Sequence, residues 1–213
     1  MLSLLRAPRS RVIYVTSQPI HPRVVDYYFG LVPELDTAEA RSRFVTLSLV
    51  DGRNLPLAKK LLERPGAIER IRGLLGKPEL ALLLPFSTSE AEVGLAVRLG
   101  IPLFGAEPAL AWLGTKKGSR QVFADEGVPH PRGFEVDGRR DLERALADLG
   151  GEGAAIVKLD RGVSGLGNAQ LDLARAADGL EAALEVEDTE LTVNDYLHAL
   201  DDQGGIVEEL VVG

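Results

Sequence analysis

The chain has 213 residues, a formal net charge of −8 at pH 7 and no cysteine. This length is enough for one large domain or two small ones. The lack of cysteine excludes disulfides, thiolate catalysis and cysteine-ligated metals, and it favours a cytoplasmic location. The negative charge argues against a nucleic-acid partner. No apolar run approaches the ~20 residues that span a bilayer, so we expect no membrane segment and no membrane partner.

Charge is unevenly distributed along the chain. Residues 1–77 contain 13 Lys and Arg against 7 Asp and Glu, whereas residues 181–213 contain 10 Asp and Glu and neither Lys nor Arg. Such asymmetry is typical of a solvated face or of a contact between domains. A basic first domain would also suit an anionic substrate, which is the alternative interpretation.

Strand and helix patterns alternate over the first half of the chain. Apolar runs predict strands at residues 11–17, 44–49, 80–84 and 102–105. Helical spacing predicts helices over residues 24–31, 55–62, 65–75 and 89–99, with Val24, Val25, Tyr28 and Leu31 sharing one face of the first. The alternation predicts a small parallel α/β sheet. No glycine loop follows the first strand, so this part is Rossmann-like in topology only.

The pattern changes after Pro108. A short helix over 109–113 precedes Thr115, which is expected to cap a helix that begins at Lys116. Further along, the sequence predicts strands at 133–136, 155–159, 169–173 and 205–212, with helices over 142–149 and 173–184. The strands at 155–159 and 169–173 are joined only by a glycine-rich loop. We therefore expect them to form an antiparallel hairpin.

The glycine-rich loop follows a lysine. Lys158 ends a buried strand pattern, and Gly162, Gly165 and Gly167 come next. Glycines let a backbone turn tightly and present N–H groups to an anion, and a nearby lysine adds a positive charge for phosphate. These residues indicate a nucleotide-phosphate site. The competing interpretation is an ordinary strand–turn–strand corner with an exposed lysine.

Three better-known motifs do not fit this loop. A Walker A loop places its lysine after the glycines, and a dinucleotide fingerprint is followed by a helix rather than a strand. A serine-hydrolase elbow needs G-x-S-x-G, whereas the residues over 162–166 end in leucine. The histidines His21, His130 and His198 have no evident triad or zinc partner and are expected to be structural.

Three segments, taken in order, resemble the ATP-grasp superfamily of carboxylate–amine ligases. Residues 114–131 are similar to the family's lysine–helix–GVPxP segment. Residues 156–158 with the loop at 162–167 are similar to its lysine strand and glycine lid. Residues 206–211 are similar to its adenine-binding hinge strand. The order and spacing of the three segments make the resemblance specific.

The resemblance extends over nearly the whole chain and implies its organisation. Segments at 14–20, 26–28 and 57–65 resemble the peptide-ligase subgroup that includes the pheganomycin ligase. The implied fold class is α/β, with a small parallel-sheet pre-ATP-grasp domain at residues 1–107. An α+β first ATP-grasp subdomain with antiparallel strands would occupy residues 108–213, and the second subdomain would be absent.

The resemblance also implies a set of phosphate contacts. Lys116 would touch the nucleotide phosphates, with Lys117 as the alternative, and Lys158 would reach the α-phosphate and the edge of adenine. The loop from Gly162 to Gly167, including Gly165, would cover the β- and γ-phosphates through backbone N–H groups, and Ser164 would add a hydroxyl donor. We expect this loop to be poorly ordered without an opposing subdomain.

The implied adenine contacts lie on the last strand. Glu208, Glu209 and Val211 would meet the base, with the Glu209 carbonyl accepting from N6 and the Val211 N–H donating to N1. Without the resemblance, Glu208 and Glu209 would be interpreted as a solvent-facing strand edge.

The implied activity is ATP-dependent ligation of a carboxylate to an amine through an acyl phosphate. The implied cofactors are ATP and Mg²⁺, and the implied substrates are amino acids or peptides. The Mg²⁺ ligands would lie beyond residue 213, so we expect this chain to be part of a ligase and inactive alone. A homodimer through the first domain is a possible assembly. The alternatives are a non-catalytic nucleotide-binding or dimerisation module and a small-molecule sensor.

Overall fold

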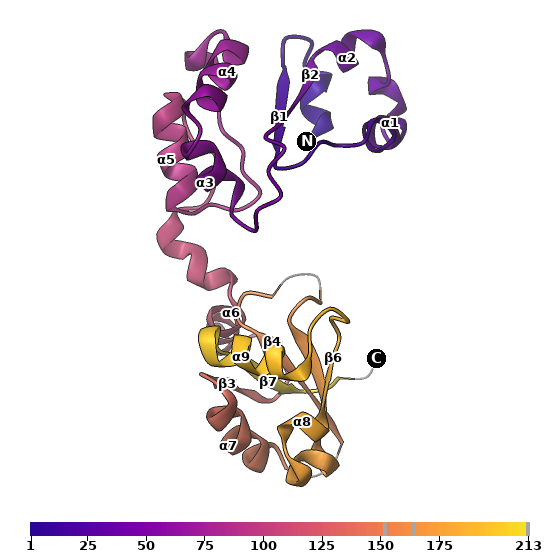
Figure 1. Cartoon of the computed structure of the whole chain (residues 1–213), viewed down its shortest axis with the longest axis vertical. Helices are drawn as coiled ribbons and strands as arrows, with labels where there is room; N and C mark the ends of the chain where they lie inside the picture. The colour runs from indigo at the N-terminus through magenta and orange to yellow at the C-terminus, as the bar shows by residue number, and fades with distance from the viewer. Residues whose placement is uncertain (151–152, 163–164, 212–213) are drawn as a thin grey trace. The chain divides into compact units, whose positions relative to one another are not determined.

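The computed structural model describes residues 1–150, 153–162 and 165–211. The chain divides into two compact units, Met1–Pro108 and Ala109–Gly213, which Figure 1 shows in indigo to magenta and in magenta to yellow respectively. The predicted fold class is confirmed, because one unit holds a small parallel sheet and the other an antiparallel sheet. Each unit is described separately below.

The first unit is built around two short parallel strands. β1 (Val12–Thr16) pairs with β2 (Phe44–Ser48). Around them lie η1 (Leu2–Arg6), α1 (Pro22–Gly30), η2 (Pro33–Leu35) and α2 (Ala38–Ser42). These elements bury one apolar cluster, consisting of Leu5, Val12, Phe29, Leu35 and Ala40.

A second apolar cluster of this unit is formed mainly by three helices. These are α3 (Leu57–Leu62), α4 (Pro65–Leu75) and α5 (Glu90–Leu99). The sequence sets the ends of α5 as expected. Ser89 and Glu92 form a complete capping box, and Gly100 ends the helix with a left-handed φ of 72°.

The strands predicted at 80–84 and 102–105 were wrong. The first segment begins with a 3-10 turn, η3 (Pro78–Leu80), and the two segments share a single parallel bridge between Leu83 and Leu103. The Leu83 N–H donates to the Pro102 carbonyl at 2.8 Å, and the Phe104 N–H donates to the Leu83 carbonyl at 2.8 Å. Pro85 and Pro102 have no N–H to extend the ladder. Leu80 and Leu82 are consequently 80% and 56% exposed.

The apolar face predicted for α1 was also wrong. Phe29 is the buried residue of this helix, whereas Val24, Tyr28 and Leu31 are exposed. Phe29 packs edge-on against Phe44 with ring centroids 5.8 Å apart, and the Arg41 guanidinium lies 4.6 Å from the Phe29 ring centroid. The large burial area of an aromatic ring therefore outweighs the spacing of smaller apolar residues in choosing the inner face.

The second unit is a five-stranded antiparallel sheet in the order β3-β7-β4-β5-β6. Its strands are β3 (Gly133–Val136), β4 (Ala154–Leu159), β5 (Asn168–Asp172), β6 (Leu184–Val186) and β7 (Gly205–Glu209). Its helices are α6 (Lys116–Asp125), α7 (Arg139–Leu149), η5 (Leu173–Asp178), α8 (Leu180–Ala183) and α9 (Val193–Gln203), and η4 (Pro108–Gly114) precedes them.

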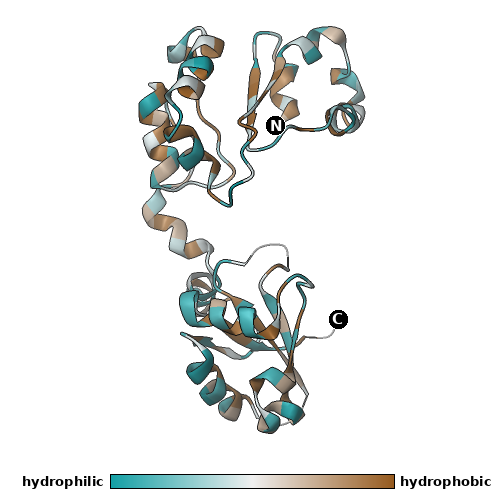
Figure 2. Cartoon of the chain, viewed as in Figure 1, coloured by the Kyte–Doolittle hydropathy of each residue, from teal (hydrophilic) through white to brown (hydrophobic). Residues whose placement is uncertain are grey.

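The core of this unit lies between the sheet and helices α7 and α9. Leu142, Ala145, Leu146 and Leu149, the predicted face of α7, are all buried there. α7 contacts β3 and β7, α9 contacts β4 and β6, and the two helices contact each other, so both cover the same face of the sheet. Figure 2 shows hydrophilic colour over much of their outer sides.

Two parts of this unit differ from the predicted elements. The helix expected over 173–184 is divided into η5 and α8 by Gly179, whose φ of 107° is incompatible with a continuous helix. The helix α9 was not predicted. Its signals are present in the sequence, since Thr192 and Asp195 form a capping box and Tyr196, Leu197 and Leu200 are buried at helical spacing.

Candidate functional site

The predicted glycine hairpin is present in the second unit. β4 and β5 pair antiparallel with Lys158 opposite Asn168. Gly165 and Gly167 have φ angles of 81° and 92°, which L side chains rarely adopt. A Cβ on Gly162 would lie 2.3 Å from the Leu166 carbonyl oxygen. The glycines therefore allow a loop tighter than other residues could form.

Only part of this loop can be placed. Ser164 and its neighbour Val163 lie outside the described residues, so the proposed hydroxyl contact of Ser164 stays a prediction. The expected poor order of the loop also falls on these residues and stays a prediction. The flanking contacts are clear, because the Leu159 N–H donates to the Gly167 carbonyl at 2.8 Å and the Asn168 N–H donates to the Gly165 carbonyl at 3.0 Å.

Tyr196 of α9 fixes the second end of the loop. Its side chain is fully buried, and its hydroxyl oxygen lies 2.9 Å from the Val157 carbonyl oxygen and 3.0 Å from that of Gly167. Burial, with a smaller contribution from the charge of Glu187, raises the pKa of Tyr196 well above its ordinary value. The hydroxyl therefore stays protonated and joins α9 to β4, the strand that contains Lys158.

The two candidate lysines at the start of α6 point to different partners. Thr115 caps the helix through the Gly118 N–H, as predicted. Lys116 Nζ donates to the Gly162 carbonyl at 3.0 Å, whereas Lys117 Nζ forms an ion pair with Asp137. Lys116 is thus the one in contact with the glycine loop. This geometry favours Lys116 over Lys117 as the phosphate contact.

Glu208 lies in the middle of the sheet. β7 is paired with β3 on one side and β4 on the other, so the solvent-facing edge that was the alternative for this strand is wrong for Glu208. Side chains alternate along the strand. Val207 joins the core under α7 and α9, and Glu208 therefore faces the opposite side, where β7 contacts α6.

The Glu208 carboxylate bridges two cations. Its Oε2 accepts from Lys158 Nζ at 2.7 Å, and its Oε1 accepts from Arg120 Nη1 at 2.7 Å. The Glu208 side chain is 8% exposed, that of Arg120 13% and that of Lys158 28%. Charged hydrogen bonds with so little water are stronger than those at a surface.

Arg120 was missed in the sequence. It lies four residues after Lys116 on the same helix, and this spacing places both on one face of α6. A second contact, from Arg120 Nη2 to the Gly133 carbonyl at 2.8 Å, attaches the guanidinium to β3. The i, i+4 relation to Lys116 is the signal that would have identified it.

The remaining predicted residues lie outside this ion cluster. The Glu209 side chain is about half exposed and lies 3.7 Å from Arg132 Nη1, and its N–H donates to the Arg132 carbonyl at 2.9 Å. Val211 is exposed. The structure therefore brings together two groups, Lys116 with Gly162 and Lys158 with Glu208, and leaves the last two hinge residues at the surface.

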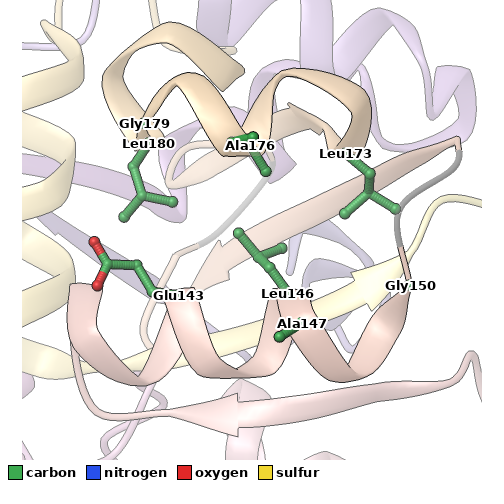
Figure 3. A pocket seen from close by; sticks show the side chains of 9 residues that line it. Glu143, Leu146, Ala147, Gly150, Leu173, Ala176, Gly179 and Leu180 are labelled. Carbon is green, nitrogen blue, oxygen red and sulfur yellow. The ribbon is translucent and has the colours of Figure 1, made fainter.

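Two cavities among the described residues lie away from these side chains. A cavity of about 450 Å³ lies between α7 and η5–α8 and is lined mostly by leucine, alanine and glycine (Figure 3). Among the described residues that line it, Glu143 is the charged one, and Leu146 and Leu180 line the gap between the helices. A smaller cavity of about 330 Å³ in the first unit is lined by Arg64 and Arg70 among others. Neither is lined by a predicted site residue.

Two features are absent from the described residues, 1–150, 153–162 and 165–211. In these ranges no group of three or more His, Cys, Asp and Glu side chains could hold a metal ion. In the same ranges no helix is long and apolar enough to cross a membrane.

Comparison with solved structures identifies the class of fold. The chain matches D-alanyl-alanine synthetase A from Vibrio cholerae with a TM-score of 0.51 and 13% identity, over 96% of this chain and 60% of that one. N5-carboxyaminoimidazole ribonucleotide synthetase from Thermus thermophilus matches with a TM-score of 0.42 and 23% identity, over 94% and 47% of the two chains. The fold is that of the ATP-grasp ligases.

The chain is also similar in sequence to a curated ligase. The chain is 26% identical to L-propargylglycine–L-glutamate ligase from Streptantibioticus cattleyicolor over 219 aligned residues. The match covers 97% of this chain and 45% of the relative, so the chain spans less than half of that ligase's length. The predicted resemblance to ATP-grasp carboxylate–amine ligases is confirmed. No family model matches the chain.

Proposed function

We propose that this chain supplies the nucleotide contacts of an ATP-dependent carboxylate–amine ligase. One observation carries the proposal. Two lysines from separate elements, Lys116 and Lys158, lie beside one glycine loop, and the second is bonded to a buried carboxylate on the adjacent strand β7. In a chain with the fold of the ATP-grasp ligases, this arrangement suits a polyphosphate and the base attached to it.

The local geometry fits a nucleotide. Gly162 and Gly167 let the loop fold closely on itself, since a Cβ would lie 2.3 Å from the Leu166 carbonyl oxygen at Gly162 and 3.2 Å from the Leu159 side chain at Gly167. The backbone of the loop can then approach phosphate oxygens and donate N–H groups to them. Lys116 and Lys158 add positive charge where the β- and γ-phosphates and the α-phosphate are proposed to lie.

We place adenine along the end of β7. The Glu209 carbonyl would accept from N6 and the Val211 N–H would donate to N1. Glu208 lies beside them with its carboxylate held by two cations. The exposure of Glu209 and Val211 supports this placement, because backbone groups that read a base must be accessible to it.

The proposed reaction uses ATP to activate a carboxylate. Bound ATP supplies a phosphoryl group, so that the carboxylate becomes an acyl phosphate with loss of ADP and an amine then displaces phosphate. The lysines and the loop N–H groups would neutralise charge on the transferring phosphoryl group and hold it in place. The expected position of the Mg²⁺ ligands, beyond residue 213, stays a prediction.

The substrates and the organisation of the domains are part of the same proposal. The name of the curated relative indicates that it joins two amino acids, and we propose amino-acid or peptide substrates here. We assign residues 1–107 to a pre-ATP-grasp domain and residues 108–213 to the first ATP-grasp subdomain. The pheganomycin-type subgroup, the homodimer and the cytoplasmic location stay predictions.

Nucleotide binding provides the first test. Calorimetric titration of the chain with Mg·ATP is expected to show saturable binding, and titration with Mg·GTP is expected to show weaker binding. Complete lack of ATP binding, by the chain and by any longer reading frame that contains it, would remove both the ligase and the nucleotide-binding alternative, and would favour the sensor interpretation.

Turnover provides the second test. ADP release is measured with a panel of amino acids and peptides, using the chain alone and any longer reading frame that contains it. We expect ADP release that depends on both a carboxylate and an amine in the longer protein and none with the chain alone. ATP binding without ADP release from any substrate would favour a non-catalytic nucleotide-binding module.

A further inference from the structure

We propose that Arg120 is a positioning residue that makes Lys158 available to the nucleotide phosphate. This inference rests on the proposed function. Arg120 holds the Glu208 carboxylate through one oxygen while Lys158 is bonded to the other. Lys158 can then exchange Glu208 for phosphate without leaving a buried carboxylate alone.

The first step concerns the cost of moving Lys158. The Glu208 side chain is 8% exposed, so water screens its charge poorly. Removing one partner from a buried ion pair is strongly unfavourable because the remaining charge has no compensation. If Lys158 were the only cation beside Glu208, phosphate would have to compete against this full cost. Arg120, at 2.7 Å from the other oxygen, supplies the compensation.

The second step concerns which cation moves. Arg120 is fixed at two points, because its Nη1 donates to Glu208 Oε1 and its Nη2 donates to the Gly133 carbonyl at 2.8 Å. Gly133 is itself held in the sheet, because it pairs with Glu208 in the β3–β7 ladder. The planar guanidinium suits this double attachment.

Lys158 is the more mobile partner. The Lys158 side chain is 28% exposed, compared with 13% for Arg120. Among the described residues, its ammonium group makes one hydrogen bond, which is the bond to Glu208. Lys158 is also the second-last residue of β4, close to the start of the glycine loop. A flexible stem with a single charged contact can turn from carboxylate to phosphate at little cost. The arginine therefore stays and the lysine exchanges.

The test compares the affinity for ATP with the affinity for adenosine, which has the base but no phosphate. We expect the wild-type chain to bind ATP more tightly than adenosine by at least about tenfold. In Arg120→Met, Lys158 becomes the sole partner of Glu208, so the ratio of the two Kd values should fall by about tenfold while adenosine affinity changes little.

A second variant separates positioning from folding. Adding Glu208→Gln to Arg120→Met removes the carboxylate that retains Lys158, so the ATP preference should return to near the wild-type ratio. Arg120→Lys can pair with Glu208 but cannot also reach Gly133 with a fixed fork, so it should restore the preference in part. Arg139→Met, which removes the Arg139–Asp201 ion pair elsewhere in this unit, should leave the ratio unchanged.

The outcomes distinguish the two levels of the proposal. A wild-type chain that binds ATP no more tightly than adenosine overturns the phosphate site and this inference with it. A wild-type preference that survives in Arg120→Met overturns the inference alone. A double variant that circular dichroism shows to be folded, but that does not regain the ATP preference, also overturns the inference. In that case Arg120 would have a purely structural role, because the loss of a structural arginine cannot be corrected by Glu208→Gln.

Discussion

Asp51 and Glu208 are buried carboxylates in different units, each bonded to two cationic side chains. Asp51 lies just after β2, with Arg53 donating to both of its oxygens at 2.8–3.1 Å and Arg64 adding a bond of 2.8 Å. Glu208 is bonded to Arg120 and Lys158, which come from a helix and a strand far from it in the sequence. The two clusters share a chemistry and differ in what their cations can do.

The cations around Asp51 are all committed to the protein. Arg53 also bonds Glu63, Arg64 also bonds the Leu49 carbonyl, and the buried Lys60 bonds the Asp51 carbonyl and Ser17. The turn is strained as well, because the β-branched Val50 beside it has a φ of 50°. These contacts describe a rigid corner after a strand.

Glu208 differs because one of its cations lies on the strand that leads into the glycine loop, which is proposed to bind phosphate. Lys158 is followed by the glycine hairpin, and Lys116 contacts the same loop. A buried carboxylate with two cations therefore does not by itself mark a functional site. The neighbouring glycine loop, which Lys116 also contacts, is what separates the second cluster from the first.

Removing the carboxylate of Asp51 should have the largest effect on stability. Asp51→Asn keeps the shape and loses the charge that holds Arg53 and Arg64, so the thermal midpoint of unfolding should fall by about 5 °C or more. Calorimetry on the chain measures it. Nucleotide affinity should not change, and a variant as stable as the wild type would show that the corner is not held by this charge.

The same residue predicts an acid dependence. Hydrogen bonds from the Arg53 side chain first, and then its backbone N–H and the charge of Arg64, hold the pKa of Asp51 well below its ordinary 3.8. A lowered folded-state pKa contributes stability that is complete above the unfolded pKa and is lost as the pH falls through the folded one. The wild-type midpoint should therefore decline below about pH 4, and Asp51→Asn should be less sensitive over that window.

Lys158 tests the other cluster. Lys158→Ala should weaken ATP binding by roughly 1.5–3 kcal/mol, or about 10- to 150-fold, which is the value of a charge-assisted contact. Stability should fall little, since Arg120 remains with Glu208. Calorimetric titration measures the affinity, with Lys77→Ala in the first unit as the control. An unchanged affinity would remove Lys158 from the phosphate site.

The glycine hairpin and the ends of most helices could be predicted because local sequence determines them. The order of lysine and glycines, the Ser89 capping box and the start of α6 at Thr115 depend on neighbouring residues only. The Glu208–Arg120 pair could not be predicted this way, because its partners are 88 residues apart in sequence. The prediction of a strand at 80–84 was wrong for a related reason, because a strand needs a pairing partner that the segment itself does not specify.

Substitution of Tyr196 should have a smaller effect than substitution of Lys158, and it should alter stability rather than nucleotide affinity. Tyr196→Phe removes a buried hydroxyl that lies between the Val157 and Gly167 carbonyl oxygens, which should cost about 1–2 kcal/mol. Calorimetric unfolding of the variant measures this cost. Hydrogen exchange should rise at the loop end around Gly167 more than in the first unit. Equal exchange around Gly167 in Tyr196→Phe and in the wild type would mean that the hydroxyl does not hold the loop.

Substitutions of Lys116 and Lys117 should have the smallest effects, and they compare two neighbouring lysines directly. They are adjacent, equally charged and at the same helix end, yet Lys116 Nζ bonds the Gly162 carbonyl and Lys117 pairs with Asp137. Lys116→Ala should therefore reduce ATP affinity by about tenfold, whereas Lys117→Ala should change it by less than about twofold. Parallel calorimetric titrations measure both. Because the two substitutions alter net charge equally, a general electrostatic effect would weaken binding in both variants to the same extent. A larger loss with Lys117→Ala would instead place Lys117 on the phosphate and Lys116 in a structural role at the loop.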